Sequence, residues 1–566
     1  MGRAATDAER GTSDEEEQRN LTRAVTAVDA IAENYVATFA ALDPCAATEL
    51  GIVGTDTNYD EELTDYSPAG VEARADAARD ALRALEHAEP ADDVDRVTVA
   101  AMRERLGIAV ELHDAGLDVG ELNVIASPLQ TLRDVFDLMA TDTDDDWSVI
   151  SRRLARIPDR VNGYLAGLRA AVRSGHAPPQ RQVQRGIAQA IRTQGLFVDM
   201  VTGAPVTNPV LGAELQRHAQ GAVAAYTSLA EALRDEIGTA ARDRDAVGRD
   251  EYRLFSRSFL GSAVDLDETY AWGLQQLESI VAEQESIAQR LYPGSTVAEA
   301  LQRLDTEQRY VIEGTDSLQQ WMQQLSNSAV DALAGTHFEI AEPLRILECR
   351  IAPTQNGGIY YTGPSEDLSR PGRMWWSVPP GVDTFHTWQE TTTVFHEGVP
   401  GHHLQIGRAV ALAGELNRWR RLACWVSGHG EGWALYAERL MAELGWLDDP
   451  GARMGMLDAQ RFRAARVVID IGVHCGMTAP GGGVWDPGRA WQFLTFHSAM
   501  AEDNLRFELD RYLGWPGQAP SYAIGQRIWQ QVRDTVTGRG LTLKEFHSRA
   551  LDLGGLPLDV LRDSLQ

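Results

Sequence analysis

The feature that most constrains the fold is a spacing of apolar residues at three and four positions, which is the period of an α-helix. This spacing extends from about residue 21 to residue 337 and is clearest over residues 71–85 and 271–291. Ala, Leu, Arg, Glu and Gln, which all favour helices, dominate the stretch. Clusters of proline and glycine, such as residues 67–70, separate successive helices. The pattern predicts a mainly α-helical protein, without the fixed-period repeat that is typical of a solenoid.

A short segment of different composition follows between residues 338 and 382. Residues 344–351 alternate between apolar and polar side chains, as a strand does, and a glycine-rich turn precedes residues 359–362. A third apolar run occupies residues 374–378. We expect these runs to form a small antiparallel β-sheet next to a helix at residues 387–397.

Helical periodicity resumes after this sheet, and the later helices are expected at residues 404–424, 431–444, 459–474, 490–513 and 522–538. The chain therefore divides into three parts. They are an acidic disordered tail (1–20), an N-terminal helical region that covers the cleft (21–337), and a catalytic region with the small sheet and the metal-binding helices (338–566).

The charge balance excludes several classes of partner. The 566 residues contain 52 Lys and Arg against 82 Asp and Glu, which gives a net charge of −30. A field of this sign repels phosphate groups, so we expect neither nucleic acid nor an anionic membrane as a partner. Four cysteines are too few for a disulfide framework, and the chain has neither a secretory signal nor a long apolar run. These features predict a cytoplasmic protein and leave its oligomeric state open.

The densest cluster of ionisable residues begins with the sequence TTTVFHEGVPGHHLQ at residue 391. In a zincin site two His bind zinc, and a Glu directly after the first His activates the metal's water; His396 and Glu397 have this order. The usual second His is four residues after the first, but here that position is Pro400. On an unbroken helix His403 would lie nearer the first ligand's face than His402. Because proline and the following glycine favour a bulge or kink, either histidine remains a candidate.

A third ligand is expected downstream, in the sequence SGHGEGWALYAE at residues 427–438. Glu431 follows His396 by 35 residues, which is enough for one antiparallel helical crossing. Two His from one helix and a Glu from the next is the gluzincin arrangement of zinc ligands. His429 is the competing candidate.

These motifs resemble those of the bacterial domain of unknown function 885 family. The resemblance rests on HEGVPGHHLQ, EGWALYAERLMAELG, RVVIDIGVH and RYLGWPGQAPSYAIG in the C-terminal third, and the helical N-terminal part covers the rest from about residue 25. Since the family is assigned to the gluzincin-like metallopeptidases, the resemblance implies a zincin-like helical body and a metal-dependent hydrolase. The family motif HExxPGH implies His396, His402 and Glu431 as zinc ligands and Glu397 as general base. His403 then supports the site or contacts substrate.

Further polar residues share one helix face in RVVIDIGVH. Arg466, Asp470 and His474 are each four residues apart. A carboxylate there, or Glu438 two turns after Glu431, could orient a ligand imidazole through its other ring nitrogen. His474 could reach substrate. An internal ion-pair network is an equally good explanation of the trio.

The loop RYLGWPGQAPSY joins two expected helices at residues 511–522. It resembles the loop in which related helical metallopeptidases place a hydrogen-bond donor for the oxyanion. Tyr522 is the first candidate donor and Tyr512 the second, while Arg511 could bind a substrate carboxylate. The expected strand at residues 359–362 could bind an extended substrate by β-addition. Each of these features can also be explained as packing.

The sequence thus predicts a zinc-dependent hydrolase that cleaves peptide or related amide bonds of short substrates. Two alternatives use the same residues. A non-haem Fe(II) enzyme also has two His and one carboxylate as ligands, although it needs no base after the first His. A non-catalytic binding protein on the same fold has no reason to retain that base.

Overall fold

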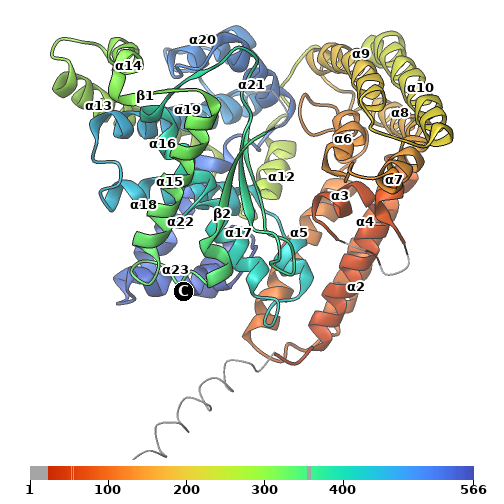
Figure 1. Cartoon of the computed structure of the whole chain (residues 1–566), viewed down its shortest axis with the longest axis horizontal. Coiled ribbons are helices and arrows are strands. Elements are labelled where there is room, and N and C mark those ends of the chain that lie inside the picture. The colour runs from red at the N-terminus through yellow and green to blue at the C-terminus, as the bar shows by residue number, and fades with distance from the viewer. Residues whose placement is uncertain (1–22, 53, 55–56, 353–357) are drawn as a thin grey trace, which may run out of the picture.

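The computed structural model describes residues 23–52, 54, 57–352 and 358–566, and helices dominate it (Figure 1). This confirms the prediction of a mainly helical protein with a small amount of sheet. The tail expected over residues 1–20 lies outside the described residues. Within the described ranges, no helix is both long and apolar enough to cross a bilayer.

The first helices begin the main body of the molecule. They are α2 (Ala27–Leu42), α3 (Pro44–Glu49), α4 (Pro68–Glu86) and α5 (Asp93–Asp114). The helical spacing of Val71, Ala78 and Leu85 places them on one face of α4, where all three are buried. Apolar residues of α2, α4 and α5 share one continuous core with helices from the C-terminal half of the chain.

A second, separate core lies between the next helices, in the upper right of Figure 1. These helices are α6 (Pro128–Asp134), α7 (Asp144–Leu154), α8 (Ile157–Arg173), α9 (Gln180–Thr202) and α10 (Pro209–Ala232). The ring of Phe197 meets Phe136 and Tyr226 edge-on, with centroids 6.2 and 5.3 Å apart. The chain then returns to the main body through the short α11 (Gly238–Ala240).

The remaining helices complete the main body. They are α12 (Arg249–Leu260), α13 (Leu266–Leu291), α14 (Val297–Thr306), α15 (Thr315–Leu333), α16 (Thr387–Glu397), α17 (His402–Ala411), α18 (Ser427–Glu443), α19 (Pro450–Cys475), α20 (Pro487–Phe496), α21 (Glu502–Gly514), α22 (Ser521–Gly538), α23 (Leu543–Asp552) and α24 (Leu558–Leu565). Short 3₁₀ or π turns lie between them and in the preceding regions: η1 (Tyr59–Glu61), η2 (Val135–Leu138), η3 (Leu233–Ile237), η4 (Gln308–Tyr310), η5 (Glu342–Arg345) and η6 (Trp419–Ala423).

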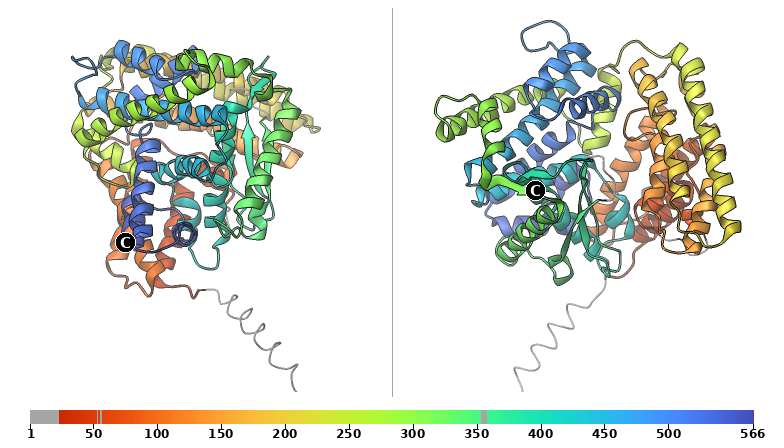
Figure 2. Two further views of the ribbon diagram at one scale, coloured as in Figure 1. Left: turned by 90° about the vertical axis from the view of Figure 1, so that its left-hand side faces the viewer. Right: turned by 45° about the horizontal axis from the view of Figure 1, so that its top comes forward.

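The centre of the main body is α19, which packs against α13, α16 and α22, as the views in Figure 2 show together with Figure 1. Helices α18 and α22 approach so closely that their backbones touch. A Cβ added at Gly432 would lie 2.4 Å from the carbonyl carbon of Gly525, and one added at Gly525 would lie 2.0 Å from the carbonyl oxygen of Gly428. Only glycine fits this crossing, which brings the N-terminal turns of α18 and α22 side by side.

Two small sheets lie beside α16. Strand β1 (Val311–Glu313) pairs antiparallel with β5 (Thr384–His386), which leads directly into α16. The larger sheet has the order β2–β4–β3, with β2 (Leu347–Ile351), β4 (Gly372–Trp376) and β3 (Ile359–Thr362). Strands β3 and β4 are antiparallel, but β2 and β4 are parallel.

The prediction of an antiparallel sheet is therefore wrong for β2. The sequence pattern predicted a turn before residues 359–362 but not the order of the strands, and β4 lies between β2 and β3. The central position suits β4 because it carries buried Met374 and Trp376, which pack into the sheet's own apolar cluster. Strand β3 lies at an edge of the sheet.

Several helix boundaries also differ from the predicted ones. The helix expected over residues 404–424 ends at Ala411, and the one expected over residues 490–513 is the pair α20 and α21. Helix α18 begins at Ser427, so Glu431 lies in its second turn and does not open the helix as expected. The helix predicted at residues 387–397 matches α16 at both ends.

Candidate metal centre

The candidate site is built around a break between two helices. Helix α16 ends at Glu397, and α17 begins at His402. A Cβ added at Gly401 would lie 1.8 Å from the carbonyl oxygen of His396, so only glycine allows the chain to turn this tightly. The indole of Trp433, from α18, donates hydrogen bonds to the carbonyl oxygens of Pro400 (2.8 Å) and Gly401 (3.2 Å). A full break, rather than the expected bulge, thus separates the two histidine-bearing segments.

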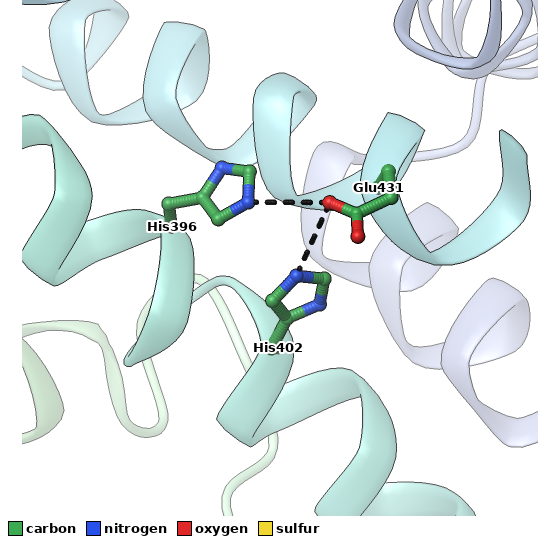
Figure 3. Close-up of side chains that lie close together, drawn as sticks. All are labelled: His396, His402 and Glu431. Atoms are coloured by element: carbon green, nitrogen blue, oxygen red, sulfur yellow. Dashed lines mark ion pairs between the residues drawn. The ribbon is translucent and has the colours of Figure 1, made fainter. Parts of the chain in front are cut away.

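The break brings His396 and His402 to face Glu431 of α18 (Figure 3). The Nε2 atoms of His396 and His402 lie 3.4 and 3.5 Å from the same oxygen of Glu431. Donor atoms about 2.05 Å from a tetrahedral zinc ion lie about 3.4 Å apart, so the spacing fits one shared ion. In the described part of the chain, these three residues form the group of metal-binding side chains with such spacing.

Charge at the cluster also favours a cation. Burial disfavours the charged forms of both His396 and Glu431. The carboxylates of Glu431 and Glu438 nevertheless raise the pKa of His396 to about 9. The two imidazoles in turn lower the pKa of Glu431 well below its usual value, against the effect of burial. An ionised carboxylate beside two ring nitrogens forms a place where positive charge is stabilised.

His403 faces the opposite way from His402. Its Nε2 donates to the carbonyl oxygen of Leu344 (2.8 Å), and its Nδ1 accepts from the hydroxyl of Tyr361 on β3 (3.0 Å). Burial lowers the pKa of His403 to about 4, so the ring is neutral. Because both ring nitrogens have partners, His403 connects α17 to the small sheet and lies outside the cluster.

A carboxylate on α18 orients His396. Glu438 lies seven residues after Glu431 and therefore on the same face of the helix. Its Oε1 accepts from Nδ1 of His396 (2.8 Å), and its Oε2 accepts from the hydroxyl of Thr392, one turn before His396 on α16 (2.8 Å). Nδ1 of His402, in contrast, is buried without a hydrogen-bond partner among the described residues. Carboxylate-to-imidazole bonds of this kind fix the ring that binds a metal.

Glu397 is 7% exposed and follows His396 at the end of α16. Burial raises the pKa of its carboxyl group, while the charges of His396 and His402 act in the opposite direction. A buried carboxylate with a raised pKa is suited to accept and return a proton. The competing ligand candidate, His429, lies elsewhere: Gln405 contacts its Nδ1 at 3.2 Å, and its ring packs on Trp529.

Tyr522 lies in the first turn of α22, where the glycine crossing brings it near Glu431. Its ring lies under two guanidinium groups, 5.0 Å from Arg466 and 6.0 Å from Arg463. Burial and the charge of Glu431 raise the pKa of Tyr522. Its hydroxyl therefore keeps its proton and can donate a hydrogen bond.

Three of the other predicted site residues, Arg466, Arg511 and Tyr512, belong to one buried network around Glu508. Glu508 accepts from Nη2 of Arg466 (2.9 Å), from Nη1 of Arg511 (2.9 Å) and from the hydroxyl of Tyr512 (2.5 Å). Arg511 also donates to Gln518 (2.6 Å). The structure therefore places Tyr512 and Arg511 in internal hydrogen bonds, although they were expected to contact an oxyanion and a substrate carboxylate.

Asp470 and His474 do not meet the cluster either. One oxygen of Asp470 accepts from the hydroxyl of Tyr252 (2.7 Å) and from the amide of Gly517 (2.9 Å). His474 is 1% exposed, with Nε2 bonded to the carbonyl oxygen of Tyr512 (2.9 Å) and its ring stacked on Tyr252. Shared spacing on α19 put these residues on one face, but that face packs against α12 and the loop before α22.

Three partly exposed side chains lie beside the cluster, each in a stretch of helix that is otherwise buried. Every residue from 427 to 438 is buried except Glu431, and every residue from 516 to 525 is buried except Tyr522. From 460 to 475, the exception is Arg463. The structure describes all three stretches in full. The three side chains come from stretches of α18, α22 and α19 that are otherwise buried. Tyr522 adjoins both other side chains, so the three partly exposed residues lie together beside the cluster.

Sequence reasoning missed two residues of this site. Thr392 had a usable signal, because it precedes His396 by four residues and so shares its helix face. Arg463 had none, since nothing in the sequence distinguishes it from the other arginines of α19.

With this geometry established, the chain can be compared with known proteins. Residues 44–565 match the family described as bacterial protein of unknown function (DUF885). The chain belongs to this family. The DUF885 match covers nearly the whole main body and the second core, which confirms the expected family over most of the chain.

Two solved structures share the fold of this DUF885 protein. One, described as a putative lipoprotein from Colwellia psychrerythraea, is 22% identical, with a TM-score of 0.82, over 96% of this chain and 99% of that chain. The other, a putative lipoprotein of unknown function from Shewanella oneidensis, is 15% identical, with a TM-score of 0.71, over 94% and 98%. No curated protein matches the chain. At these identities the likeness shows the fold alone.

Proposed function

We propose that this DUF885 protein is a zinc-dependent hydrolase that cleaves peptide or related amide bonds of short substrates, with His396, His402 and Glu431 as the zinc ligands. The observation that carries the proposal is the spacing of the three ligand atoms, 3.4 and 3.5 Å from Nε2 to Oε2, which suits one tetrahedral ion. Two histidines from one motif and a glutamate from a later helix also form the gluzincin ligand pattern, in agreement with the resemblance of the motifs.

The bound ion would supply an activated water and polarise the carbonyl group of the substrate. Glu397 would accept the proton of that water and return it to the leaving nitrogen. The hydroxyl of Tyr522 would donate to the negative charge that develops on the carbonyl oxygen. Glu438 and Thr392 would hold the His396 ring in place.

Direct metal analysis tests the ligand set. We expect His396→Ala, His402→Ala and Glu431→Ala each to lower the zinc content of the purified protein sharply, because each removes one of three ligands. His403→Ala is the matched control, since it lies next to a ligand but bonds to Leu344 and Tyr361. Zinc loss in His403→Ala, together with retention in His402→Ala, would exchange the roles of the two histidines.

Hydrolysis tests the reaction. Zinc-loaded protein should cleave members of a mixed peptide pool followed by mass spectrometry, and chelation should stop the cleavage. Iron retained in protein purified without chelator, with turnover that depends on oxygen, would identify a non-haem iron enzyme instead. Absence of both metal and cleavage would identify a binding protein. Cytoplasmic localisation, the absence of nucleic-acid and membrane partners, and pairing of a substrate with β3 stay predictions.

A further inference from the structure

Arg463 differs from the other arginines around it on α19. Nη1 of Arg463 donates to the carbonyl oxygen of Ala459 in its own helix (3.2 Å), and its Nε is buried without a hydrogen-bond partner. Arg461, in contrast, bonds to Gln284, His497 and the carbonyl oxygen of Phe496. Among the described carboxylates, none forms an ion pair with Arg463 within 4.0 Å. The guanidinium group therefore keeps donors that the protein does not use.

Arg463 lies beside two residues of the proposed active site, Tyr522 and Glu397. It is the one residue of α19 between positions 460 and 475 that is not buried, in a stretch that is described throughout. Its guanidinium lies 6.0 Å from the ring of Tyr522, and its charge acts on the carboxyl group of Glu397. The unused donors thus lie beside the proposed oxyanion donor, Tyr522, and close enough to the proposed base, Glu397, for their charge to act on it.

The arginines near Tyr522 differ in their carboxylate partners. Arg466 and Arg511 share one carboxylate, Glu508, while Arg463 has none. Arginines cannot lose their charge, so an anion from outside the chain is the natural partner.

We propose that Arg463 binds a carboxylate of the substrate, so that the enzyme prefers peptides that carry a carboxylate close to the bond that is cut. This inference rests on the proposed hydrolase function and specifies its substrate class. A planar guanidinium with free donors matches a carboxylate through two parallel hydrogen bonds. Arg463 takes the role that the sequence suggested for Arg511, whose donors the structure uses internally. In a peptide the carboxylate comes from the C-terminus or from an acidic side chain.

Two matched peptide pairs distinguish these sources. The first pair is acetyl-trialanine with a free C-terminal carboxylate and the same peptide as its C-terminal amide. The second pair is acetyl-Ala-Glu-Ala-amide and acetyl-Ala-Gln-Ala-amide. We expect zinc-loaded wild-type protein to show a kcat/KM at least about tenfold higher for the acid in one of the pairs, because charge-assisted bonds are lost in its neutral partner. The pair that is discriminated identifies the source; equal kcat/KM values in both pairs would overturn the inference.

A variant tests whether Arg463 causes the preference. Arg463→Gln should lower kcat/KM for the acid at least about tenfold and leave the amide unchanged, since only the acid uses the guanidinium. Arg453→Gln is the matched control, because it removes an arginine of the same helix whose charge is already paired with Glu283 (2.7 Å). An unchanged ratio of acid to amide in Arg463→Gln, or an equal loss on both peptides, would overturn the role of Arg463.

The conservative variant decides the matter if Arg463→Gln fails to fold. Arg463→Lys keeps the charge but cannot form two parallel bonds, so the preference for the acid should fall several-fold and not vanish. A ratio equal to that of wild type would contradict the inference.

Failure of the hydrolase function can be separated from failure of this inference. Titration calorimetry of the same peptide pairs with zinc-loaded Glu397→Gln protein measures recognition without turnover. Tighter binding of the acid, lost when Arg463→Gln is added, would support carboxylate recognition even if no peptide is ever cleaved. Equal binding of acid and amide would reject it.

Discussion

At the residue scale, the site depends on which groups hold the ligands in place. Glu438 is 1% exposed and uses both oxygens, one on His396 and one on Thr392. It therefore fixes the tautomer and direction of the ring without lying in the ligand cluster. Asp470, on the neighbouring helix, is as deeply buried, but its partners are Tyr252 and Gly517.

Replacement of Glu438 should therefore weaken zinc binding specifically. Glu438→Gln removes the charge that favours the donating imidazole, and we expect zinc affinity to fall by roughly 10- to 100-fold in a competition titration with a chelator. Asp470→Asn is the control, because burial already raises the pKa of Asp470 to about 7 and an amide oxygen can accept the same two bonds. Similar losses of affinity in the two variants would indicate a general structural effect.

The proposed base and oxyanion donor can be separated from the ligands in the same way. Glu397→Gln keeps the size of the side chain but not its basicity, so turnover should fall at least about 100-fold. Tyr522→Phe should lower turnover by roughly 100- to 1000-fold if the hydroxyl stabilises the oxyanion. Both variants should keep wild-type zinc stoichiometry in metal analysis. Metal loss in Glu397→Gln would make it a ligand, and full activity would exclude it as the base.

At the element scale, the break between α16 and α17 determines which histidine meets Glu431. The sequence identified the ends of α16 and the two possible histidines. Ideal helix geometry favoured His403, whereas the distortion expected at Pro400 and Gly401 and the family motif favoured His402. The deciding contacts come from distant segments: Leu344 and Tyr361 bind His403, and Trp433 binds the carbonyl groups of the break. Local periodicity carries no information about such partners.

Tertiary contacts, which local sequence periodicity does not reveal, also explain the other differences between the predicted and observed elements. The apolar alternation of β2 and β3 was recognisable, but the pairing order depends on where β4 packs, which is a tertiary effect. The spacing of Arg466 and Asp470 predicted one shared helix face correctly, but not which helices cover it. Helix existence was therefore largely predictable, and the contacts around the site were not.

A glycine substitution tests the break itself. Gly401→Ala should destabilise the protein and lower its zinc content, because its Cβ would lie 1.8 Å from the carbonyl oxygen of His396. Gly195→Ala is the control: it lies within α9 with no atom within 4 Å of its Cβ, so it should raise the free energy of unfolding by about 0.5–1 kcal/mol. Denaturant unfolding and metal analysis measure both effects. Normal zinc content and stability in Gly401→Ala would contradict the geometry of the break.

At the scale of the whole molecule, the two largest apolar cores among the described residues are distinct. One lies among α6–α10, and the other joins α2, α4 and α5 to the helices that carry the ligands (Figures 1 and 2). Because molecules with separate cores need not unfold in one step, each core can have its own transition. The ligands belong to only one of them.

Calorimetry should detect this division. A ligand that binds only the folded state stabilises it by about 2.7 kcal/mol at a free concentration 100 times its Kd. Zinc should therefore raise the transition temperature of the main core and leave that of the α6–α10 core unchanged. The shift should be absent in His402→Ala. Equal shifts of both transitions would mean that the two cores unfold as one unit.

The break between α16 and α17 also has a mechanical consequence. Where both histidines lie on one continuous helix, the distance between them is set by the helix alone. Here the distance depends on the angle between two helices, so an ion bound by both His396 and His402 would fix that angle. Helix α18 supplies the third proposed ligand, Glu431. It also supplies the indole of Trp433, which donates hydrogen bonds to the carbonyl oxygens of Pro400 and Gly401 at the break. Glu431 and Trp433 are two residues apart on the same helix, so any tilt of α18 moves the proposed ligand and the indole together.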